Sequence, residues 1–67
     1  MTRGEVATLL RGFVRDFALD LFDACDIFGR VGPDGIDAET LGDWLDGNGY
    51  PELAAAAYAL EEVAPVA

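Results

Sequence analysis

Apolar residues recur every three or four positions through the first 28 residues of the chain. The repeating positions are Val6, Leu10, Phe13, Val14, Phe17, Leu21, Cys25 and Phe28, with Leu9 beside them. This spacing places them on one stripe of an α-helix, with Arg and Asp residues on the opposite side. A glycine at position 29 and a Gly-Pro pair at 32–33 then supply a stop signal. The pattern predicts one long amphipathic helix from about Arg3 to Phe28.

Two shorter helices are predicted after a glycine-rich loop at residues 29–36. Asp37 is a suitable N-cap for a helix from Ala38 to Asp46, which the Gly-Asn-Gly sequence at 47–49 ends. Pro51 suits the first turn of a third helix, which runs to about Val63. The alternation typical of β-strands is absent. We therefore expect an all-α fold, a single domain of residues 1–67, in which the two shorter helices pack across the long one as a small three-helix bundle.

The composition narrows the chemistry. The 67 residues include 13 acids and 4 cations, all of them arginine, for a net charge of −9, and they contain no Lys, His, Ser or Gln. This inventory excludes Ser or His catalysis, a His-ligated metal, a P-loop lysine and unaided binding of nucleic acid. Because 52% of the residues are hydrophobic, the chain is not a disordered acidic tail.

Enzymatic and metal-binding functions find little support. Paired carboxylates need a pocket that desolvates one of them, and so short a chain rarely encloses one of several hundred Å³. The acidic and glycine residues at 34–39 are similar to those of a calcium-binding loop between two helices. In a loop of residues 29–40, however, Gly29, Val31, Pro33 and Thr40 occupy positions where calcium needs oxygen ligands. Cys25 lies on the apolar stripe without a His, which indicates a buried structural thiol. We expect no catalysis, no cofactor and no metal.

Acidic residues form the strongest remaining signal. Residues 1–30 hold four Arg and five acids, whereas residues 31–67 hold eight acids and no cation. Asp16, Asp20 and Asp23 are spaced i, i+4 and i+7, which predicts a row on the long helix, although like charges at this spacing are destabilising. The predicted partner-binding site consists of Asp16, Asp20, Asp23, Asp26, Asp34, Asp37, Glu39, Asp43 and Asp46.

Two interpretations of these acids stay open. The simpler one is that they keep a small apolar protein soluble. The sharper one is that they dock on a strongly basic protein surface, where carboxylates one helical turn apart occupy Arg and Lys sites that otherwise hold nucleic-acid phosphates.

An alternative function uses apolar surface instead. The third helix is apolar on nearly every side from Leu53 to Leu60, and its expected inner face is Leu53, Ala56, Ala57, Leu60 and Val63 or Ala64. A small bundle cannot cover all of this surface. The remainder, with Tyr50 and Tyr58, would then serve protein–protein interaction or homodimerisation.

In size, acidity, compactness and lack of catalytic residues, the whole chain resembles the small phage-encoded inhibitors of host defence, the anti-CRISPR proteins in particular. The resemblance implies a non-enzymatic inhibitor that occupies a basic, nucleic-acid-binding surface of a protein or ribonucleoprotein effector. It implies a place in the cytoplasm of a bacterial host and no direct contact with nucleic acid. The longest apolar run has eight residues, against about 20 for a membrane span, so no membrane association is expected.

Overall fold

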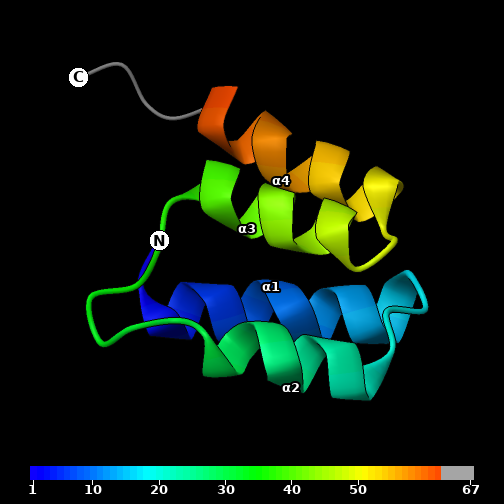
Figure 1. The fold of residues 1–67 in the computed structure, drawn as a ribbon, viewed down its shortest axis with the longest axis horizontal. Helices are drawn as coiled ribbons and strands as arrows, with labels where there is room; N and C mark the ends of the chain where they lie inside the picture. Colours follow the sequence, from blue (N-terminus) through cyan, green and yellow to red (C-terminus); the bar gives the residue numbers. More distant parts are fainter. Residues whose placement is uncertain (63–67) are drawn as a thin grey trace. The chain divides into compact units, whose positions relative to one another are not determined.

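The computed structural model describes residues 1–62, with side chains through residue 60. In that range it contains four α-helices, α1 (Arg3–Asp16), α2 (Leu21–Gly29), α3 (Ala38–Gly47) and α4 (Pro51–Glu62) (Figure 1). The all-α class is confirmed, whereas the prediction of three helices is wrong. The chain divides into two compact units: unit 1 is Met1–Ile36 with α1 and α2, and unit 2 begins at Asp37 and holds α3 and α4.

The long N-terminal helix predicted from the apolar stripe is interrupted after Asp16. The C-cap of α1 is Phe17, whose N–H donates to the carbonyl of Phe13 at 2.9 Å. Ala18 then adopts a left-handed φ of 58°, which turns the chain out of the helix. Neither glycine nor proline stands at this break, so the usual sequence signals of a helix end are missing.

A new helix begins because Asp20 caps it. The Asp20 carboxylate accepts hydrogen bonds from the backbone N–H groups of Phe22 at 2.9 Å and of Asp23 at 3.3 Å. In a continuous helix this carboxylate would lie one turn from Asp16 and repel it. As an N-cap it satisfies orphan N–H groups and lies at the positive end of the α2 dipole.

The interruption also changes which residues of α2 are buried. The α1 part of the predicted stripe is confirmed, because Val6, Leu10 and Phe13 are buried. The rest of the stripe is wrong at Phe17, Leu21 and Cys25, which are exposed, while Phe28 is half-buried. Ala24 and Ile27 are the buried residues of α2. A four-residue connection between the helices resets the helical phase, so the stripe does not continue through it.

The loop after α2 is held against the start of the chain. Ile36 donates its N–H to the carbonyl of Met1 at 3.0 Å, and the Met1 nitrogen donates to the Ile36 carbonyl at 2.6 Å. Gly35 has a φ of 82°, and a Cβ built on it would fall within 3.0 Å of Met1 backbone atoms. Both the left-handed conformation and the close approach require glycine at this position.

Unit 2 is a pair of helices joined by a short turn (Figure 1). Asp37 caps α3 as predicted, because its carboxylate accepts the Thr40 N–H at 3.0 Å. The predicted bounds of this helix hold to within one residue. Of the two glycines considered for the turn, Gly49 takes the left-handed conformation, with a φ of 90°.

The α4 helix turns a narrower apolar face inward than predicted. Leu53, Ala54 and Ala57 are buried, whereas Ala56 is exposed and Leu60 is 43% exposed. The predicted end of this helix at Val63 and the inner positions Val63 or Ala64 lie outside the described residues. The two helices of unit 2 approach closely where the Tyr58 ring lies against the backbone of Gly42.

Candidate functional site

The acidic residues predicted to bind a partner lie at the surface. Asp23 is half-buried and the other eight are exposed. They belong to both units: Asp16, Asp20, Asp23, Asp26 and Asp34 to unit 1, and Asp37, Glu39, Asp43 and Asp46 to unit 2. Because the two units are separate bodies, we consider each set by itself.

The predicted row of Asp16, Asp20 and Asp23 does not form. Asp16 is the last residue of α1, Asp20 is the N-cap of α2, and Asp23 lies in the first turn of α2. The i, i+4, i+7 relation requires one continuous helix, and the break at residues 17–20 removes it. Nothing in the spacing of the three aspartates indicated this interruption.

Two acids of unit 1 are neutralised locally. Arg15 makes a two-point contact with Asp16, with both N···O distances at 3.1 Å, and this hydrogen bonding holds the pKa of the Asp16 carboxyl below its usual value. Arg30 reaches Asp26 one helical turn away at 3.0 Å. Over residues 1–36 the chain has four arginines and six acids, a net charge of −2. Unit 1 therefore carries little unbalanced charge.

Unit 2 retains the acidic row. Glu39, Asp43 and Asp46 stand at i, i+4 and i+7 on the continuous helix α3, so they share one face. All three are exposed. No Arg or Lys occurs anywhere from residue 37 to the end of the chain, which holds seven acids and a net charge of −7. We call Glu39, Asp43 and Asp46 the α3 acidic row.

Tyr58 joins this row from the neighbouring helix. Its hydroxyl donates a hydrogen bond to Oδ1 of Asp43 at 2.5 Å. That bond, together with partial desolvation and the negative charges of Asp43, Asp46 and Glu39, raises the pKa of Tyr58 to about 12. The sequence pattern had placed Tyr58 on an apolar docking surface, and its i+15 relation to Asp43 becomes visible only once α3 and α4 pair.

The remaining two acids have local structural positions. Asp34 lies in the turn that the Gly35 N–H closes by donating to the Gly32 carbonyl at 3.0 Å. Asp37 is the N-cap of α3, and hydrogen bonds from Thr40 hold the pKa of its carboxyl below the usual value. In the described part of the chain, no three carboxylates or thiols come close enough together to hold a metal ion.

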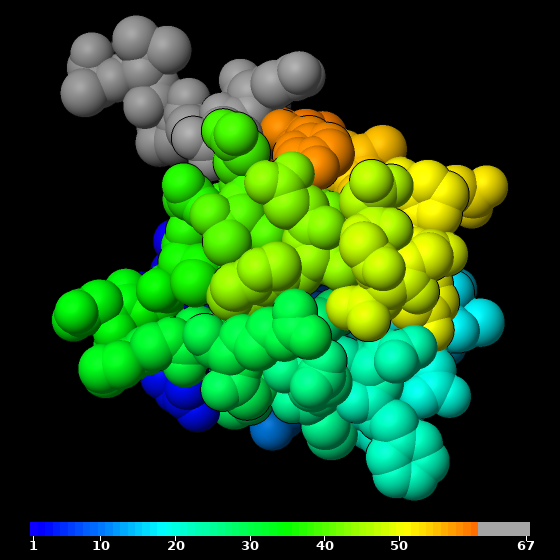
Figure 2. Space-filling view, viewed as in Figure 1, coloured from blue at the N-terminus to red at the C-terminus, as the bar shows by residue number. Residues whose placement is uncertain are grey.

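The apolar docking surface proposed for α4 is reduced in the structure. Its Leu53 is buried, and the exposed positions other than Leu60 between residues 55 and 60 are alanines. Larger exposed apolar side chains lie in unit 1, where Phe17, Leu21 and Phe22 are 63%, 61% and 83% exposed. Side chains at the start of α2 project from the surface (cyan in Figure 2).

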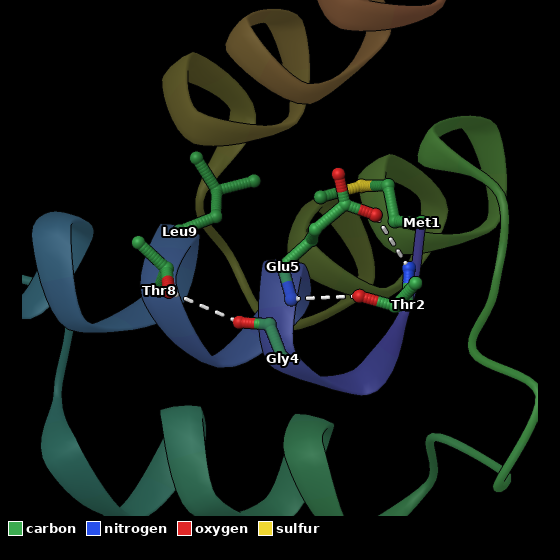
Figure 3. A pocket seen from close by; sticks show the side chains of 6 residues that line it. All are labelled: Met1, Thr2, Gly4, Glu5, Thr8 and Leu9. Atoms are coloured by element: carbon green, nitrogen blue, oxygen red, sulfur yellow. Dashed lines mark hydrogen bonds between the residues drawn. The ribbon is translucent and has the colours of Figure 1, made fainter.

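Two hollows of unit 1 are large enough to receive a small ligand. One is a broad, open depression of about 640 Å³ along the first turns of α1 (Figure 3). Its polar groups bond to one another, since Thr2 and Glu5 form a reciprocal capping box and the Thr8 hydroxyl donates to the Gly4 carbonyl. Several polar groups of this depression therefore already have partners within the chain. The other is an apolar groove of about 370 Å³ between α1 and α2.

None of the helices in the described range has the length and apolarity that crossing a bilayer requires. A scan against protein-family models and searches of curated proteins and of solved structures found no match to this chain.

Proposed function

We propose that this chain is a non-enzymatic, acidic protein-binding inhibitor of the anti-CRISPR kind. In the bacterial cytoplasm it occupies a basic, nucleic-acid-binding surface of a protein or ribonucleoprotein effector. The observation that carries the proposal is the α3 acidic row, which has three exposed carboxylates on one helix face and no cation in its unit.

The spacing of the row suits a basic groove. Glu39 and Asp46 are seven residues apart on α3, which is about 10 Å along the helix axis. Duplex DNA presents roughly six charges over that length, at one per ~1.7 Å. Three carboxylates would therefore engage some of the Arg and Lys side chains that contact a stretch of duplex, and Asp37, which caps the same helix, would extend the contact.

Tyr58 supports the row without cancelling it. An arginine beside Asp43 would neutralise the carboxylate, whereas the Tyr58 hydroxyl orients it and leaves its charge in place. A carboxylate that is already oriented loses less conformational freedom when a partner binds. Repulsion within the row costs a few tenths of a kcal/mol per pair in the free protein, and a basic partner would relieve that repulsion.

The test is inhibition of target-DNA binding by purified CRISPR effector complexes, measured at low and at physiological salt. We expect the wild-type chain to block DNA binding of one effector class, and more strongly at low salt. The triple variant Glu39→Gln, Asp43→Asn, Asp46→Asn should lose this inhibition.

A matched control changes the net charge equally in unit 1. The variant Asp16→Asn, Asp26→Asn, Asp34→Asn also removes three negative charges and should retain most of the inhibition. The proposal fails if the wild-type chain inhibits no effector, if the α3 variant inhibits as well as wild type, or if both variants lose inhibition to the same degree.

A further inference from the structure

A second candidate site lies in unit 1, whereas the α3 acidic row belongs to unit 2. It is the apolar groove of about 370 Å³ between α1 and α2. Ala7 and Val14 line it from α1, and Leu21, Cys25 and Phe28 line it from α2. Its volume is near the lower end of the ~300–1,000 Å³ that small-molecule sites occupy, and such sites combine mostly apolar walls with a few polar groups.

The charged side chain that lines this groove is Arg11. The other three arginines of the chain have contacts elsewhere. Arg15 and Arg30 pair with neighbouring aspartates, and Arg3 lies 4.3 Å from the centre of the Phe28 ring. Arg11 lines the groove and is exposed, and it makes no hydrogen bond or ion pair with the residues that the structure describes. A guanidinium beside an apolar surface favours a ligand that carries a carboxylate at one end.

We propose that the groove between α1 and α2 binds a small anionic amphiphile of the medium-chain fatty acid class. Its apolar body lies along Val14, Leu21 and Phe28, and its carboxylate accepts hydrogen bonds from the Arg11 guanidinium. This site does not depend on the function proposed for α3.

A second copy of the chain fits the groove less well. No carboxylate lines the groove, so two grooves meeting face to face would leave both Arg11 side chains unpaired and close to one another. Each copy also brings a net charge of −9. A carboxylate ligand with a single charge avoids both penalties, since it brings one negative charge to a groove whose lining contains Arg11 and no carboxylate.

Cys25 supplies a direct reporter of occupancy. It lines the groove, its side chain is exposed, and it is the single cysteine of the sequence. A ligand in the groove should slow the alkylation of its thiol by iodoacetamide, while leaving the helix content of the protein unchanged.

The experiment is a calorimetric titration of the full chain with octanoate, and with 1-octanol as the uncharged compound of equal length. We expect saturable binding of one octanoate per chain and protection of Cys25 from alkylation. Arg11→Gln should weaken octanoate binding about fivefold and leave 1-octanol binding unchanged. Cys25→Trp should fill the groove and weaken octanoate binding at least tenfold, whereas Cys25→Ser should stay within twofold.

Phe22→Ala is the matched control for adsorption to exposed apolar surface. Phe22 is 83% exposed and does not line the groove, so its removal should leave octanoate binding within twofold of wild type. The proposal is overturned if octanoate shows no saturable binding, if Arg11→Gln binds octanoate as well as wild type, or if Phe22→Ala loses as much affinity as Cys25→Trp.

Discussion

Asp20 and Asp37 each hold the first turn of a helix through their carboxylates. An N-cap oxygen satisfies backbone N–H groups that have no partner inside the helix, and its negative charge lies near the positive end of the helix dipole. In Asp37 these bonds lower the pKa of the carboxyl, so its contribution to stability is present above the unfolded value near 4 and is lost as the pH falls through the folded pKa.

Removing the Asp20 cap should destabilise the protein. We expect Asp20→Ala to lower the free energy of unfolding by about 1 kcal/mol, as N-cap deletions commonly do. Asp20→Asn keeps a side-chain oxygen at the cap and should lose less than half as much. Urea unfolding followed by far-ultraviolet circular dichroism measures both changes. Equal losses in the two variants would contradict a capping role for the carboxylate oxygen.

Tyr58 gives the α3 acidic row a measurable signature. Its pKa is raised to about 12 by the bond to Asp43, so the neutral hydroxyl is favoured in the folded protein. The stabilisation that follows is fully present below pH about 10, the ordinary pKa, and is lost as the pH rises from about 10 to about 12.

The ultraviolet absorbance of tyrosinate, titrated in a Tyr50→Phe background, tests this. We expect a midpoint near 12, as the structure indicates, and a lower midpoint in the Asp43→Asn variant, where the anionic acceptor is gone. Circular dichroism at each pH confirms that the helices persist. A midpoint near 10 in the folded protein would show that Tyr58 does not contact the row.

At the scale of the elements, the connection between α1 and α2 decides how unit 1 is built. Ala18 holds a left-handed φ of 58°, a conformation in which a Cβ is unfavourable. The connection turns the chain back so that α1 and α2 contact one another, and Leu10, Phe13, Ala24 and Ile27 are buried. It also leaves Leu21 and Phe22 at the surface.

Ala18→Gly distinguishes this connection from a continuous helix. With a left-handed φ at position 18, glycine should raise the free energy of unfolding by up to about 1 kcal/mol, because the strain on Cβ is removed. Within an uninterrupted helix the same change would lower it by a similar amount. Urea denaturation gives the sign of this change in the free energy of unfolding. An increase supports the end of α1 at Asp16, and a decrease indicates a continuous helix.

Two mid-helix glycines should respond oppositely to alanine. A Cβ on Gly12 in α1 meets nothing within 4 Å, whereas a Cβ on Gly42 in α3 falls within 3 Å of the Tyr58 ring. We expect Gly12→Ala to stabilise by about 0.5–1 kcal/mol through helix propensity. Gly42→Ala should destabilise by about 1–3 kcal/mol through overpacking.

Urea denaturation of the two glycine variants measures both effects, and the penalty of Gly42→Ala should shrink in a Tyr58→Ala background. Stabilisation by both substitutions would mean that α3 and α4 do not approach at Gly42. Destabilisation by both would mean that Gly12 is not free of contacts.

At the scale of the whole molecule, charge is distributed unequally between the units. Unit 1 holds all four arginines and a net charge of −2, while the chain from Asp37 onward carries −7. Ion pairs such as Arg15–Asp16, with side chains 78% and 52% exposed, contribute little to stability. Uncompensated repulsion in unit 2 is therefore the main electrostatic effect on folding.

Salt should consequently stabilise this protein. We expect the thermal midpoint to rise as NaCl increases from about 0.01 M to about 0.3 M, because the Debye length shortens and repulsion among the carboxylates weakens. The variant Glu39→Gln, Asp43→Asn, Asp46→Asn should show a smaller rise. A midpoint that falls with added salt would indicate that attractive ion pairs outweigh the repulsion.

The sequence predicted the parts of the site that depend on one helix alone. Glu39, Asp43 and Asp46 share a face because α3 is continuous, and their spacing and the cap at Asp37 were both readable along the chain. The row at Asp16, Asp20 and Asp23 had the same spacing in the sequence, but this prediction was wrong. Whether the first helix continues or a new helix begins at Asp20 depends on how unit 1 packs.

The sequence by itself determined the helical class, the α3 and α4 segments and the charge asymmetry. Periodicity, caps and residue counts can be read without knowing which neighbouring helix each element packs against. Only the tertiary structure decided that the first apolar stripe divides into two helices, that Cys25 and Arg11 line a groove, and that Tyr58 meets Asp43. The physical reason is that these outcomes depend on contacts between elements. At residues 17–20, local helix propensity favours one continuous helix, whereas burial of Ala24 and Ile27 favours two helices.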